Sequence, residues 1–142
     1  MGNDWFSPGA VKFTRRQVLW LVQNLGSLRE GRWPPEASSY IDIPTGKRNV
    51  SRRAPFSTPI EYAAEITDRA EKCGEDGLIL IAIECWGETL QSMSRYLKRP
   101  EWSINKRRKR ALAYVASGPA RRWHNTRKRK AQSYEEFKER KR

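Results

Sequence analysis

Residues 77–115 of this 142-residue chain read "GLILIAIECWGETLQSMSRYLKRPEWSINKRRKRALAYV" and contain three short helical patterns, with a tight turn before the last. The apolar residues at the start fit either a buried strand or a helix, but no second strand-like run is present to pair with a strand. We therefore predict helices over about 78–86, 89–98 and 103–116. Pro100 separates the last two, because proline lacks an amide hydrogen and restrains the residue before it. This order predicts a helix-turn-helix within an all-α fold.

The last of these helices has an apolar side and a basic side. At about 100° per residue, the apolar side carries Ile104, Ala111 and Val115. The residues broadly opposite are Ser103, Lys106, Lys109 and Arg110, and those on the flanks are Asn105 and Arg107. In a helix-turn-helix, the final helix lies in the major groove of DNA and its first turns touch base edges. We therefore expect the basic side of this helix to face DNA.

The residue types on this side suit nucleic-acid recognition. Arg or Lys can donate to guanine, Asn can bond adenine, and Ser can do either. Glu101, at the start of the helix, fits two roles: it could accept from cytosine N4 or favour the positive end of the helix dipole. Because a helix shows only one side to the groove, most of the five consecutive cations at 106–110 would contact phosphate and set affinity rather than sequence.

The formal charge of +13 is nearly all C-terminal. From Arg99 onward, sixteen Lys or Arg stand against four Glu, whereas the residues before it carry thirteen cations and twelve acids. Such one-sided charge suits a polyanion, because neutralised phosphates release condensed counterions; an anionic membrane surface would accept the same charge. Further nucleic-acid contacts are expected from the C-terminal cations Arg121, Arg122, Arg127, Lys128, Arg129 and Lys130.

The chain divides around the helix-turn-helix. Residues 1–58 are expected to hold an N-terminal helix and a long proline-containing loop. Residues 59–118 form the helical domain, with the helix-turn-helix at about 78–116. Residues 119–142 form a basic tail whose last part, near 134–141, is compatible with a short helix.

Capping signals predict where two earlier helices begin. Thr14 and Thr58 each stand three residues before a Gln or Glu, which is the spacing of a capping box. The helix after Thr58 is expected to run to Lys72, with Gly74 placed to end it.

Composition argues against a catalyst, a metal site and a membrane span. Cys73, Cys85 and His124 are the only cysteines and histidine, too few for a four-ligand zinc site. No glycine-rich phosphate loop is present, and the acid pair that begins at Glu135 lies in a basic tail. The longest apolar run, Leu78–Ile83, is far short of the roughly 20 residues that span a bilayer. We therefore expect a non-enzymatic, cytoplasmic protein without cofactor, metal or membrane partner.

Six tryptophans argue against a wholly disordered chain. Trp20, Trp86 and Trp102 are expected in the core or at its edge, because tryptophan brings a large area for burial. Trp123 fits either stacking on bases or packing against the domain.

Residues 77–115 also resemble a known family, the C-terminal promoter-reading domain (region 4) of bacterial sigma factors. The similarity lies in an apolar helix ending at Trp86, in Ile104 as the first core residue of the recognition helix, and in residues 107–112, which resemble its basic "RxKRAL" ending. It covers about forty of the 142 residues. Lys98 and the residue after it stand where the family has a glycine and a small aliphatic residue. The resemblance implies double-stranded DNA and RNA polymerase as partners. Phage regulators, antiterminator-like proteins and terminase small subunits share such motifs.

Together these observations predict a double-stranded DNA-binding transcription regulator of a phage or mobile element, acting in the bacterial cytoplasm, with a second copy of the chain as a candidate partner. One alternative is an RNA-binding component that acts through the basic tail. The other is a DNA-packaging or assembly protein, similar to a terminase small subunit, whose apolar surface would come from Val18, Trp20 and Leu21.

Overall fold

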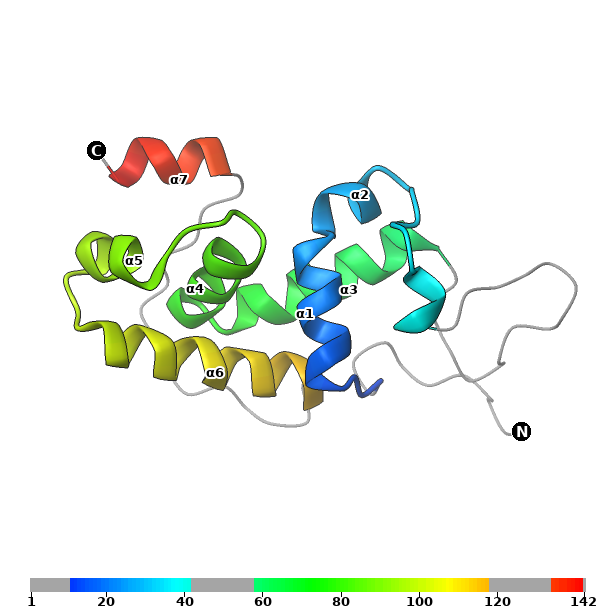
Figure 1. Ribbon diagram of the computed structural model, residues 1–142, viewed down its shortest axis with the longest axis horizontal. Helices are drawn as coiled ribbons and strands as arrows, with labels where there is room; N and C mark the ends of the chain where they lie inside the picture. Colours follow the sequence, from blue (N-terminus) through cyan, green and yellow to red (C-terminus); the bar gives the residue numbers. More distant parts are fainter. Residues whose placement is uncertain (1–10, 42–57, 118–133, 142) are drawn as a thin grey trace, which may run out of the picture.

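The computed structural model describes residues 11–41, 58–117 and 134–141, and every regular element within these ranges is a helix (Figure 1). The elements are α1 (Arg15–Gln23), α2 (Leu25–Arg29), the short 3-10 helix η2 (Ala37–Ser39), α3 (Pro59–Lys72), α4 (Glu75–Glu84), α5 (Leu90–Leu97), α6 (Glu101–Ser117) and α7 (Tyr134–Lys141). The all-α fold is therefore confirmed, and the apolar run that also fitted a strand is helix α4. In the described part of the chain, no helix combines the length and the apolarity that crossing a membrane needs.

Reciprocal capping boxes open three of the helices. At the start of α1, the Thr14 amide donates to Gln17 over 2.8 Å and the Gln17 amide donates to the Thr14 hydroxyl over 3.1 Å. Thr58 and Glu61 make the same exchange at the start of α3, as the sequence predicts. A third box, begun by Thr89, opens α5. These bonds satisfy amide groups that the first turn of a helix leaves without partners.

Two glycines allow α3 and α4 to fold back closely on each other. Gly74 follows the end of α3 with a φ of 60°, a left-handed conformation that glycine adopts without steric cost. Three residues later, a Cβ on Gly77 would lie 1.8 Å from the carbonyl oxygen of Ala70. The two helix backbones therefore touch at a point where no side chain fits.

The buried side chains form two clusters that share α4 and α6. The larger cluster joins α1, α2 and α3 to the C-terminal half of α6, and its fully buried members include Val18, Leu21, Val22, Leu25, Leu28, Ile66, Cys73, Leu80 and Val115. The smaller joins α4, α5, α6 and α7 through Leu78, Ile79, Ala82, Met93, Leu97, Ile104 and Phe137. Because Ile104 and Val115 lie in different clusters, each end of α6 is held by its own cluster.

Val18, Trp20 and Leu21, expected as a surface in the assembly alternative, are buried in the larger cluster and offer no such surface.

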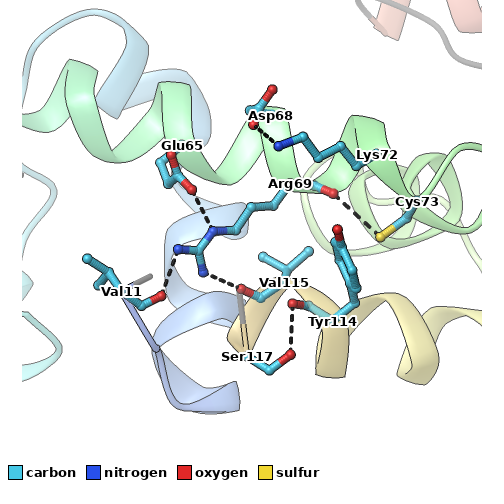
Figure 2. Close-up of polar contacts among 9 residues, drawn as sticks. All are labelled: Val11, Glu65, Asp68, Arg69, Lys72, Cys73, Tyr114, Val115 and Ser117. Carbon is cyan, nitrogen blue, oxygen red and sulfur yellow. Dashed lines mark hydrogen bonds and ion pairs between the residues drawn. The ribbon is translucent and has the colours of Figure 1, made fainter. Parts of the chain in front are cut away.

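The C-terminal end of α6 is held by the N-terminal segment and by α3. The Phe13 amide donates to the Ala116 carbonyl over 2.8 Å. Figure 2 shows the guanidinium of Arg69, fully buried on α3, pointing between Glu65, the Val11 carbonyl and the last turn of α6. The Arg69 guanidinium therefore links the first described residues to the C-terminal end of α6.

A three-residue turn joins α5 to α6. Lys98 ends α5 in the left-handed conformation, with φ 56° and ψ 48°. The Arg99 amide donates to the Ser94 carbonyl over 3.1 Å, and the Pro100 carbonyl accepts from the Ser103 amide over 3.0 Å. In Figure 1, α5 lies over the N-terminal end of α6. The turn allows α6 to begin at Glu101, the residue expected at the start of the helix, and the helix extends one residue past the predicted end at 116.

Helix α7 packs on the side of α5 that faces away from α6 (Figure 1). Phe137 is fully buried, with its ring centroid 5.4 Å from that of Trp86 and 4.7 Å from that of Tyr96. The Tyr134 hydroxyl donates to Glu88. The short helix predicted near the C-terminal end is thus present, and among the described elements it does not cover the outer side of α6.

Candidate nucleic-acid interface

The predicted division of α6 into two sides is present. Ile104, Ala111 and Val115 are fully buried. The side chains on the opposite side are exposed, and we call them the α6 outer face: Trp102, Lys106, Lys109 and Arg110. The first three, with Ala113, fall on one stripe because they are spaced by three or four residues along the helix.

Arg107, predicted as a DNA contact, lies against the start of α4 instead. Its guanidinium donates to Glu75 over 2.7 Å and lies 3.7 Å from Asp76. The Glu75 and Asp76 side chains are 3% and 0% exposed. A buried carboxylate needs a nearby cation, so Arg107 has a structural task in this fold.

Asn105 is held by its neighbour on the helix. Arg108 donates to the Asn105 side-chain oxygen over 3.0 Å and 3.3 Å, and to Glu84 on α4 over 3.2 Å. Ser103 is half-buried beside the turn, and Glu101 is exposed in the first turn of α6. The acid at this position suits the positive end of the helix dipole, which is one of the two roles expected for it.

The turn before α6 adds cations that the sequence interpretation left out. Lys98 and Arg99 are exposed, and so is Arg95 on α5. Within the described ranges, Lys98, Arg99, Lys106 and Lys109 have no carboxylate at ion-pair distance. Both cations are visible in the letters "LKRPE", but the helix-turn-helix pattern places them in the turn and not on the recognition helix.

Asp76 supplies negative charge behind this surface. Neither of its carboxylate oxygens accepts a hydrogen bond from the described residues. Burial raises the pKa of this carboxyl, and the positive charges of Arg107, Arg110 and Arg99 oppose the rise. The field of Asp76 therefore reaches cations of both the turn and the middle of α6.

Trp102 is placed differently from the prediction. Trp20 is buried and Trp86 is half-buried against α7, as expected, but Trp102 is 70% exposed. The reason is helix phase: because α6 begins at Glu101, Trp102 is fixed two residues from the buried Ile104 and points to the opposite side.

The described part of the chain offers no group of three or more His, Cys, Asp or Glu side chains arranged to hold a metal ion. Cys73 and Cys85 are not in disulfides, and burial raises the pKa of Cys73 to about 12, which disfavours the thiolate form.

The cations expected as contacts in the basic tail, Arg121, Arg122, Arg127, Lys128, Arg129 and Lys130, lie outside the described residues. Comparison of this chain with protein-family models, curated proteins and solved structures finds no match.

Proposed function

We propose that this protein binds double-stranded DNA with the outer face of α6 in the major groove. One observation carries the proposal: the cations of α6 are divided between two tasks. Arg107 and Arg108 are paired with acids of α4, whereas Lys106 and Lys109 are exposed and have no acidic partner among the described residues. Cations that stabilise no part of the fold are the ones available to phosphates.

The dimensions and surroundings of α6 suit this docking. A helix with side chains is about 10–12 Å across and fits the major groove, which is about 12 Å wide. α5 supports the N-terminal end of α6 from behind, and α7 lies beyond α5 (Figure 1). In this arrangement the start of α6 meets base edges, and Lys109 and Arg110, farther along, reach the phosphate backbone.

The resemblance to sigma region 4 supports a more specific proposal. In that family, the counterpart of the α5 and α6 pair reads promoter DNA, so the function proposed for this chain is transcription regulation in a phage or mobile element. Contact with RNA polymerase and pairing of two copies on a two-fold symmetric site belong to the same proposal. A fold-level likeness carries function only by analogy, so DNA binding is tested first.

The test removes two outer cations and compares the result with a matched control. Lys106→Ala with Lys109→Ala removes two charges from the α6 outer face, and Lys12→Ala with Arg15→Ala removes two exposed charges near α1. Binding to a duplex of about two helical turns is measured by fluorescence anisotropy over a range of salt concentrations. We expect the first variant to bind more weakly, with a salt slope shallower by about two, since each phosphate contact contributes about 0.9.

The control variant should keep the affinity and the slope of the wild-type protein. Equal binding by all three proteins would overturn the assignment of α6. Tighter binding to a structured RNA competitor, unaffected by the two α6 substitutions, would favour the RNA alternative. Selection of bound duplexes from a random pool then identifies the site.

A further inference from the structure

Trp102 is an exposed aromatic side chain without a structural task. Among the described residues, the large hydrophobic side chains that are exposed are Trp102 and Ile60. Ile60 lies on α3, where it lines an open pocket with Arg29, remote in sequence from the α6 surface. No ring, cation or hydrogen-bond partner of the Trp102 side chain is found in the described part of the chain. Exposure of so large an apolar area to water is unfavourable, so covering the ring with a partner makes the free energy of binding more favourable.

The surroundings of Trp102 are cationic. Lys98 and Arg99 precede it in the turn, and Lys106 and Lys109 follow it on the same stripe of α6. The centre of a protein-docking surface is depleted of charged residues, which does not fit this position. A helix that lies in a membrane interface needs an apolar side, but the apolar side of α6 is buried in the two clusters. An aromatic ring among cations that have no acidic partner in the described ranges suits a nucleic acid.

The position of Trp102 on α6 determines which part of the nucleic acid its side chain would contact. It is the second residue of α6, at the end that faces base edges when a recognition helix enters the major groove. The C5 methyl of thymine is the apolar group that base pairs display in that groove. Resting on the DNA-binding function proposed above, we infer that Trp102 covers thymine methyl groups and makes the protein prefer an A·T pair where α6 enters the groove.

The experiment removes the methyl group and the ring separately. The full chain and its Trp102→Ala variant are titrated with an alternating dA–dT duplex and with the same duplex in which deoxyuridine replaces every thymidine. The replacement deletes the methyl and keeps the hydrogen-bonding groups. One buried methyl contributes about 0.8 kcal/mol, which corresponds to about a fourfold change in the dissociation constant. We expect the wild-type protein to bind the thymine duplex at least about fourfold more tightly, and Trp102→Ala to bind both duplexes equally.

The variant also controls for DNA shape. If the loss of methyl groups acted by changing the groove, Trp102→Ala would keep the full preference for thymine, and the inference would be overturned. Equal binding of both duplexes by the wild-type protein would also overturn it, while leaving duplex binding intact. Absence of duplex binding at low salt would instead reject the proposed function itself. If Trp102→Ala lost binding to anionic phospholipid vesicles or to single-stranded RNA but not to either duplex, the ring would serve that other ligand and the inference would fail.

A melting curve accompanies each titration. Because Trp102 is 70% exposed, we expect the variant to unfold at nearly the same temperature as the wild-type protein. A double variant with Lys106→Ala should bind more weakly than Trp102→Ala alone but should show the same ratio between the two duplexes, since phosphate contacts do not sense the methyl group.

Discussion

The buried guanidinium of Arg69 donates a hydrogen bond to the main-chain carbonyl of Val115 over 2.7 Å, and so joins α3 to the last turn of α6 (Figure 2). The same group donates to the Val11 carbonyl and to Glu65, each over 2.7 Å, and stacks over Phe13 at 5.0 Å. The last four carbonyls of a helix lack partners inside the helix, so a donor placed here fixes where α6 ends. The orientation of the outer face therefore depends on a residue far from it.

Replacing Arg69 should strongly destabilise the fold. Arg69→Met keeps much of the apolar stem but leaves Glu65 and two carbonyls without this donor, and we expect a loss of about 3–5 kcal/mol in the free energy of unfolding. Lys72→Met, on the same helix, breaks only an exposed pair with Asp68 at 3.0 Å and should cost less than about 0.5 kcal/mol. Urea unfolding of both variants measures the difference, and similar losses would contradict the role given to Arg69.

The close contact between α3 and α4 should make Gly77 intolerant of any side chain. The Cβ of Gly77→Ala would lie 1.8 Å from the Ala70 carbonyl oxygen, so one helix must shift, at a cost of about 2–3 kcal/mol or more. Gly26→Ala in α2 is the control, because its Cβ would meet nothing within 4 Å and alanine favours a helix by about 0.5–1 kcal/mol. Thermal unfolding should show opposite shifts in melting temperature for the two variants.

Lys98 should be replaceable by glycine with a gain in stability. The left-handed conformation of Lys98 raises the free energy of the folded state by roughly 1 kcal/mol for a residue with a Cβ, and glycine adopts this conformation without that strain. We expect Lys98→Gly to raise the free energy of unfolding by about that amount and Lys98→Ala to leave it nearly unchanged. If the Lys98 charge contacts phosphate, both variants should lose the same DNA affinity. A gain from Lys98→Ala equal to that from glycine would contradict the backbone explanation.

Asp76 should make stability depend on pH. Because burial raises the pKa of this carboxyl above its usual 3.8, the folded state binds the proton more tightly than the unfolded chain. The resulting stabilisation is complete below about pH 4 and is lost as pH rises through the pKa of the folded state. Asp76→Asn should therefore be more stable than the wild-type protein at pH 7, by a margin that shrinks as pH falls towards 4. Denaturation at several pH values checks this, with the exposed Asp68→Asn as control.

The elements that depend on neighbours in the sequence were predictable. The capping boxes at Thr14 and Thr58 act over three residues, and the spacing of Ile104 and Val115 on one helix determines that both lie on the same side. The helical state of α4 followed from the lack of a partner strand. These features need only local geometry, which the order of residues specifies.

The division of labour among the cations was decided by the tertiary structure. Arg107 and Lys106 are adjacent in the sequence and equally charged, yet only Arg107 meets Glu75, which lies 32 residues away. Residue type alone predicts Trp102 in the core, but its spacing of two residues from the buried Ile104 places it on the opposite side of α6. Ion pairs form between residues that folding brings together. The sequence therefore determined the helices and their sides, whereas the packing of α4 against α6 determined which cations of α6 are paired with acids.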